Sequence, residues 1–177
     1  RRARHAPPAA LRSRLDVTER RVLGAPCYTL APRGRSPRSR VLFLHGGCYV
    51  FEITPWHWRF SAALATALDC AVTVPIYPLA PEHGVDDALR MVLATYGDLG
   101  PDPVVLGDSA GGGMALALAQ LVRKAALPQP RGVVLLSPWL DATLDNPDVA
   151  RLDALDPWLS PAGMRLAGRL YARGTDP

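Results

Sequence analysis

Short apolar runs alternate with amphipathic stretches along this chain of 177 residues. Runs of four to six apolar residues are typical of strands that are buried on both faces of a parallel sheet. They predict strands at 40–44, 70–75, 103–106 and 133–136. Apolar residues three to four positions apart predict helices at 56–68, 86–99, 114–124 and 161–171. Because strands and helices alternate, we expect an α/β fold with a largely parallel sheet and helices on both faces.

The first forty residues follow another pattern. Two prolines open a stretch that predicts a short helix over 7–18. Two strands, at 20–23 and 26–30, flank Gly24-Ala25 as a hairpin, and 32–40 reads as a loop. This segment carries eleven arginines against two acidic residues, whereas residues 41–177 carry nine basic and fourteen acidic ones. Because the arginines are interleaved with apolar residues, we expect a solvated surface and no nucleic-acid partner.

Length and cysteine usage narrow the class of protein further. A chain of this size forms one domain by default, so residues 1–177 are predicted to be a single domain. Cys27, Cys48 and Cys70 are widely spaced and odd in number, which favours a reducing compartment over a disulfide framework or a zinc site. Neither a signal peptide nor a membrane-spanning run is visible in the sequence. We therefore expect a cytoplasmic protein that holds no metal.

The segment Gly107-Asp108-Ser109-Ala110-Gly111-Gly112 carries the chemistry. It reads Gly-x-Ser-x-Gly between a predicted strand and a predicted helix, which is the context of a nucleophile elbow. Small neighbours allow the strained backbone of that turn, and the helix behind it points its positive end at the reacting carbonyl. We therefore predict that Ser109 is a catalytic nucleophile.

A second glycine-rich segment, His45-Gly46-Gly47-Cys48, follows the predicted strand at 40–44. In a parallel sheet the working residues lie at the carboxyl ends of the strands, so this loop is expected beside Ser109. Backbone N–H groups of such a loop stabilise the oxyanion of acyl transfer. The predicted donors are Gly47, Cys48 and Ala110, and His45 is expected to hold the loop rather than act as a base.

Four segments together resemble the hormone-sensitive-lipase-like α/β-hydrolases, in particular their bacterial esterase branch. They are His45-Gly46-Gly47-Cys48-Tyr49, Tyr77-Pro78-Leu79-Ala80-Pro81-Glu82-His83, Gly107-Asp108-Ser109-Ala110-Gly111-Gly112 and Ser137-Pro138-Trp139-Leu140-Asp141. The resemblance covers about residues 17–177 and implies a three-layer α/β/α hydrolase sheet. It implies hydrolysis of short-chain acyl esters without cofactor or metal, a small-molecule ester as partner, and a cap to which residues 1–40 contribute alongside the first strands, with 41–177 as the catalytic core.

The sequence departs from the family pattern in three ways. Cys48 stands where glycine is usual, and Pro78 replaces the usual arginine. The serious departure is that the family's catalytic acid and histidine follow strands beyond the Ser-Pro-Trp segment, whereas His5, His45, His57 and His83 all precede Ser109. We therefore expect an incomplete hydrolase domain that lacks its last strands, exposes the strand at 133–136 as an edge, and is inactive alone.

Other functions stay open at this point. The same scaffold can be a non-catalytic small-molecule-binding module, as in the gibberellin receptor, which resembles this family and has lost the catalytic histidine. An amidase or peptidase would differ only in the leaving group. Nucleic-acid binding through the basic N-terminal segment is the weakest alternative.

Overall fold

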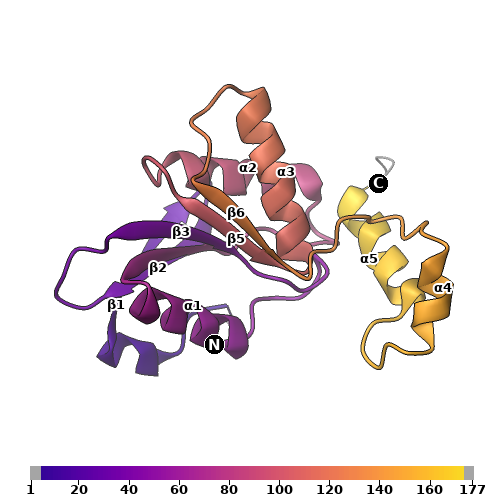
Figure 1. The fold of residues 1–177 in the computed structure, drawn as a ribbon, viewed down its shortest axis with the longest axis horizontal. Helices are drawn as coiled ribbons and strands as arrows, with labels where there is room; N and C mark the ends of the chain where they lie inside the picture. Colours follow the sequence, from indigo (N-terminus) through magenta and orange to yellow (C-terminus); the bar gives the residue numbers. More distant parts are fainter. Residues whose placement is uncertain (1–4, 174–177) are drawn as a thin grey trace.

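The computed structural model describes residues 5–173, which form one sheet with helices on both faces (Figure 1). The strands are β1 (Leu15–Val22), β2 (Ala25–Pro32), β3 (Ser39–Leu44), β4 (Cys70–Pro75), β5 (Val104–Asp108) and β6 (Gly132–Leu136). The helices are the 3₁₀ turn η1 (Ala9–Ser13), α1 (Pro55–Ala67), α2 (Val85–Gly97), α3 (Ala110–Lys124), α4 (Asp148–Asp153) and α5 (Pro161–Ala172).

The sheet has the strand order β1-β2-β4-β3-β5-β6. β1 and β2 pair antiparallel, as do β2 and β4, while β4, β3, β5 and β6 run parallel to their neighbours. The chain leaves β3 toward β4 on one side, and β5 lies on the other side of β3. This makes the carboxyl ends of β3 and β5 a topological switch point, where α/β proteins build their sites.

Two apolar clusters cover the two faces of the sheet. On one face Trp58 of α1 packs with Phe43 and Tyr28 from the strands. On the other face Met114 and Leu118 of α3 pack with α2 and with Met164 of α5. Figure 1 shows α1 on the opposite side of the sheet from α2 and α3, with α4 and α5 in a lobe beside the sheet. The predicted α/β/α layering is confirmed.

The predicted helix over 7–18 is wrong beyond residue 13. Residues 15–22 form β1, because Leu15 and Val17 alternate with exposed Asp16 and Thr18 and pair with β2. The hairpin turn is also one residue earlier than expected. Leu23 and Gly24 both have positive φ, of 48° and 85°, as a tight hairpin turn with matching twist requires.

Helix α3 begins at Ala110, four residues before the start of the helix predicted at 114–124, so Gly111, Gly112 and Gly113 are helical. Their lack of side chains is needed for packing: a Cβ on Gly111 would overlap the carbonyl of Leu44, and one on Gly112 would lie 2.8 Å from Pro138 Cβ. Helix α4 was not predicted at all. It has six residues, none of them buried, so it leaves little apolar periodicity in the sequence.

β6 lies at the edge of the sheet, as the sequence predicted. Within residues 5–173 it pairs with β5 alone. Val134 and Leu136 remain 41% and 40% exposed, although apolar strands of this kind are normally covered.

Candidate active site

Ser109 lies in the sharp turn between β5 and α3. Its backbone has φ 50° and ψ −121°, a region that non-glycine residues adopt only where the surroundings impose it. The Ser109 N–H donates to Leu136 O at 2.9 Å, and its carbonyl accepts from Trp139 N–H at 2.9 Å. Hydrogen bonds to the end of β6 and to the segment after it therefore hold the strained turn that the sequence predicted.

Glycine is required on both sides of this turn. A Cβ on Gly107 would overlap the backbone of Gly111, since β5 and the first turn of α3 are in direct contact there. The close approach places the helix N-terminus directly behind Ser109, where its positive end stabilises developing negative charge.

The oxyanion loop, residues 46–49, follows β3 and has an unusual backbone. Gly47, Cys48 and Tyr49 have positive φ values of 131°, 54° and 62°. The carbonyl of Gly47 accepts from Val50 N–H at 3.0 Å and from Phe51 N–H at 2.8 Å, which turns the loop back on itself. These two hydrogen bonds hold the loop in its positive-φ conformation.

The loop lies against the elbow. A Cβ built on Gly46 would be 3.1 Å from Ser109 Cβ, so a side chain there would collide with the serine. Within residues 5–173 the N–H groups of Gly47, Cys48 and Ala110 donate no hydrogen bond, and Ala110 is fully buried. Gly47 and Cys48 are half-buried, and three N–H groups without a protein partner beside a serine are suited to bind an oxyanion.

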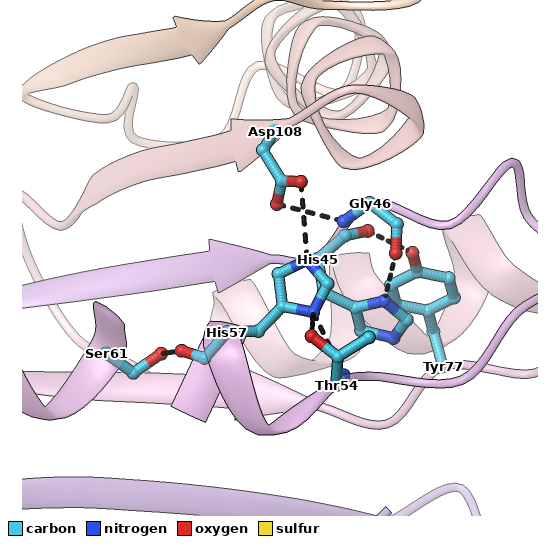
Figure 2. A network of polar contacts seen from close by, with 7 residues as sticks. All are labelled: His45, Gly46, Thr54, His57, Ser61, Tyr77 and Asp108. Atoms are coloured by element: carbon cyan, nitrogen blue, oxygen red, sulfur yellow. Dashed lines mark hydrogen bonds and ion pairs between the residues drawn. The ribbon is translucent and has the colours of Figure 1, made fainter. Parts of the chain in front are cut away.

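Asp108 links the two segments (Figure 2). Its Oδ1 accepts from Gly46 N–H at 2.9 Å, and its Oδ2 lies 3.4 Å from His57 Nε2. Burial alone would raise the pKa of the Asp108 carboxyl, but the hydrogen bonds from His57 and Gly46 outweigh it and hold that pKa below its ordinary value. Asp108 is therefore a carboxylate at neutral pH.

His45 is a structural residue of the loop, as expected from the sequence. It is 1% exposed, its Nδ1 lies 2.7 Å from Gly46 O, and its ring stacks on Tyr77 at 4.5 Å between centroids. The Tyr77 hydroxyl donates to the His45 carbonyl. Burial lowers the pKa of His45 to about 4, so the ring is neutral at physiological pH.

The other described histidines also have partners away from the nucleophile. His57 contacts Thr54 and Asp108, and His83 Nδ1 lies 3.4 Å from Asp87 Oδ2 on the surface. The His5 ring lies 6.4 Å from that of Tyr28 between centroids. Within residues 5–173 no hydrogen bond joins a histidine to Ser109 Oγ. Asp141, the last residue of the Ser-Pro-Trp segment, is exposed and accepts from Thr143, with Oδ2 accepting from Asp145 N–H.

A cavity of about 410 Å³ opens beside the oxyanion loop. Cys48, Phe51 and Pro81 line one side of it, and α5, with Gly163 and Met164, lines the other. The Cys48 thiol lies 3.5 Å from Met164 Sδ, and burial raises its pKa, so it is an apolar wall group rather than a thiolate. An acyl chain or apolar alcohol fits such a space.

In the described part of the chain, no group of three or more His, Cys, Asp or Glu side chains is placed to hold a metal ion. Among the same residues, no helix is both long and apolar enough to cross a bilayer. The three cysteines are unpaired.

Comparison with known proteins defines the class. Residues 41–177 match the family described as alpha/beta hydrolase fold, and the chain belongs to it. It is 35% identical over 143 residues to an acetyl-hydrolase of Streptomyces hygroscopicus, covering 77% of this chain and 48% of that protein. It is 35% identical over 150 residues to a triacylglycerol lipase of Mycobacterium tuberculosis, covering 77% of this chain and 34% of that protein.

The solved structures agree with the sequence relatives. The fold matches an esterase from the bacterial hormone-sensitive lipase family with a TM-score of 0.84 and 28% identity, covering 92% of this chain and 57% of that one. EstE5 gives a TM-score of 0.83 at 29% identity, over 93% of this chain and 57% of that one. The chain spans about half the length of the first curated relatives it matches.

Sequence reasoning missed the contacts that join the two catalytic segments. Asp108 belongs to the serine motif, whereas His57 lies in the helix predicted at 56–68, far from it in sequence. Their pairing bridges fifty-one positions of sequence. The one local signal is the spacing of Thr54 and His57, three residues apart at a helix start, which is a capping pattern.

Proposed function

We propose that this chain carries the nucleophile and oxyanion hole of a serine carboxylic-ester hydrolase that acts on short-chain acyl esters. Ser109 attacks the acyl carbonyl, and the N–H groups of Gly47, Cys48 and Ala110 bind the oxyanion. The observation that carries the proposal is the close approach of the 46–49 loop to a strained Ser109, with three N–H groups that donate no hydrogen bond within residues 5–173.

The reaction would proceed through an acyl-enzyme. The Ser109 oxygen bonds to the acyl carbon, the alcohol leaves with a proton, and water then releases the acid and restores the hydroxyl. Groups outside residues 5–173 would move these protons, since the described histidines are engaged elsewhere. This 177-residue chain is therefore proposed to be an incomplete hydrolase domain, inactive on its own, that works without cofactor or metal in a reducing compartment.

Covalent labelling with an alkyl fluorophosphonate tests the proposal. The phosphonyl group is expected on Ser109, identified by peptide mass spectrometry, and is expected to be absent from Ser109→Ala. Ser137→Ala is the matched control, because Ser137 is a nearby serine that also has positive φ, of 44°. Steady-state turnover of a short-chain nitrophenyl ester should be negligible. Absence of label on Ser109, or equal label on Ser137, would contradict the proposal.

A non-catalytic small-molecule-binding module is the second candidate, favoured by the lack of a histidine bonded to Ser109 within residues 5–173. It predicts saturable binding of small esters in the cavity beside Cys48 with no modification of Ser109. Binding that persists unchanged in Ser109→Ala, without labelling of the unmodified chain, would favour this reading.

A further inference from the structure

The Ser109 turn and the oxyanion loop lie side by side but are about sixty residues apart in sequence. Asp108 immediately precedes Ser109, so its carboxylate moves with the elbow. Gly46 immediately precedes the first oxyanion donor, Gly47. The hydrogen bond from Gly46 N–H to Asp108 Oδ1, 2.9 Å, therefore joins the nucleophile turn to the oxyanion loop.

That hydrogen bond needs a fixed carboxylate. A carboxylate rotates easily about its last torsion, so holding one oxygen on Gly46 depends on what holds the other. The other oxygen, Oδ2, faces His57 Nε2 at 3.4 Å (Figure 2). His57 is thus the side-chain partner that fixes the rotation of Asp108.

The orientation of the His57 ring is fixed in turn. Its Nδ1 accepts from Thr54 N–H at 3.0 Å and lies 3.0 Å from Thr54 Oγ1, at the N-terminus of α1. Because Nδ1 is an acceptor, the ring proton is on Nε2, which then donates to Asp108. The start of α1 therefore fixes the ring, and the ring fixes the carboxylate.

The pair lies on the α1 side of the sheet, where the side chains of His57 and Asp108 are 19% and 29% accessible and so partly shielded from water. A cavity of about 220 Å³ lies there, lined by His57 and Asp108 among apolar side chains such as Phe43 and Leu136. Ser109 is not among the residues that line it. Hydrogen bonds to a carboxylate are strengthened when water is excluded, and this geometry separates His57 from the nucleophile.

We propose that His57 is a positioning residue: through Asp108 it fixes the separation between Ser109 and the oxyanion amides of Gly47 and Cys48. The inference rests on the proposed hydrolase function for its purpose, but its geometric content is independent of turnover. His57 does not take the Ser109 proton. It keeps the oxyanion loop at the distance where its N–H groups stabilise the transition state.

Three variants test this role. His57→Phe keeps a ring but removes the donor to Asp108. Asp108→Asn keeps an acceptor for Gly46 but turns an amide donor toward the His57 N–H, so the two donors repel. His83→Phe is the matched control, because His83 and Asp87 form a histidine–aspartate contact of the same 3.4 Å length on the exposed surface.

Native-state hydrogen exchange of the Gly46 amide, measured by NMR on the 177-residue chain, is the primary readout. His57→Phe and Asp108→Asn should speed Gly46 exchange by about tenfold or more, as expected for loosening a charge-assisted hydrogen bond. His83→Phe should leave it within about twofold. In parallel, the maximal rate of Ser109 phosphonylation should fall in His57→Phe while the reagent concentration at half-maximal rate stays unchanged.

Gly46 exchange that is unchanged in His57→Phe would overturn the inference, whatever Ser109 does. Global unfolding of both His57→Phe and Asp108→Asn would overturn it as well, since the pair would then support the fold rather than the loop. If Gly46 responds as expected but Ser109 of the unmodified chain takes no label, the positioning geometry stands and the hydrolase proposal fails.

Discussion

The region at the carboxyl ends of β3 and β5 differs sharply from the segment that follows β6. In this region, Leu44, His45 and Ala110 are at most 1% exposed, and backbone hydrogen bonds fix each turn. Between β6 and α5, Leu155 and Trp158 are 72% and 88% exposed, and α4 buries no residue. The predicted nucleophile and oxyanion donors therefore lie on well-packed elements, whereas the segment that follows β6 is largely exposed.

The largest expected effect is at Gly47, which lies in the loop after β3, in the well-packed region of the molecule. Gly47→Ala should slow acylation of Ser109 about 100-fold, because the added Cβ shifts the loop and displaces an oxyanion donor, and losing such a donor typically costs ~3 kcal/mol. Its φ of 131° disfavours a side chain, and a Cβ would lie 2.6 Å from Phe51 O. Mass spectrometry of Ser109 acetylated by a nitrophenyl ester measures the rate.

Gly97→Ala is the control for that change, since a Cβ at Gly97 meets nothing within 4 Å and its φ is not in the positive region. It should acylate at the rate of the unmodified chain. Equal rates for Gly47→Ala and the unmodified chain would show that the 46–49 loop does not bind the oxyanion.

The buried ring of His45 should make stability depend on pH. Its folded pKa of about 4 lies below the ordinary 6.5, so the unfolded chain binds more protons between these values. The neutral His45 ring contributes fully to the free energy of unfolding above pH 6.5. This contribution is lost as pH falls toward 4, and the total loss is about 3 kcal/mol. Urea unfolding of the unmodified chain and His45→Gln across this range should show a flatter profile for the variant.

His83→Gln is the matched comparison for that profile, because His83 is exposed and its side chain is 52% accessible. It should keep the full pH dependence of the unmodified chain. A His45→Gln profile as steep as that of His83→Gln would contradict the assignment of the effect to the buried ring.

The smallest effect is expected at Cys48. Cys48→Gly relieves the strain of a side chain at positive φ, which costs about 1 kcal/mol. Glycine also gives the unfolded chain more conformational freedom, which opposes this gain, so the free energy of unfolding should change by less than about 1 kcal/mol. The N–H donor remains, so acetylation of Ser109 should keep its rate. Longer acyl groups should react faster, because the thiol no longer narrows the cavity. A loss of acetylation would show that the thiol itself takes part.

The sequence predicted the sheet's parallel core and the Ser109 elbow, because apolar runs and glycine spacing are local signals. It failed at 15–18, where β1 replaces the expected helix, because pairing with β2 decides the structure of a short alternating stretch. The His57–Asp108–Gly46 contacts were missed for a related reason. They join α1, β5 and the loop after β3, and local sequence patterns do not predict a contact between residues fifty or sixty positions apart.

We propose that Ser109 and its oxyanion amides are assembled, whereas no histidine within residues 5–173 is bonded to Ser109 to act as its base, and added imidazole tests this most directly. Acetylation of Ser109 by p-nitrophenyl acetate, followed by mass spectrometry, should accelerate at least about tenfold with imidazole, part of the ~10²–10⁴ that a positioned base supplies. The same addition should produce no acetyl-peptide in Ser109→Ala. Fast acetylation of Ser109 without imidazole, or none with it, would contradict the account.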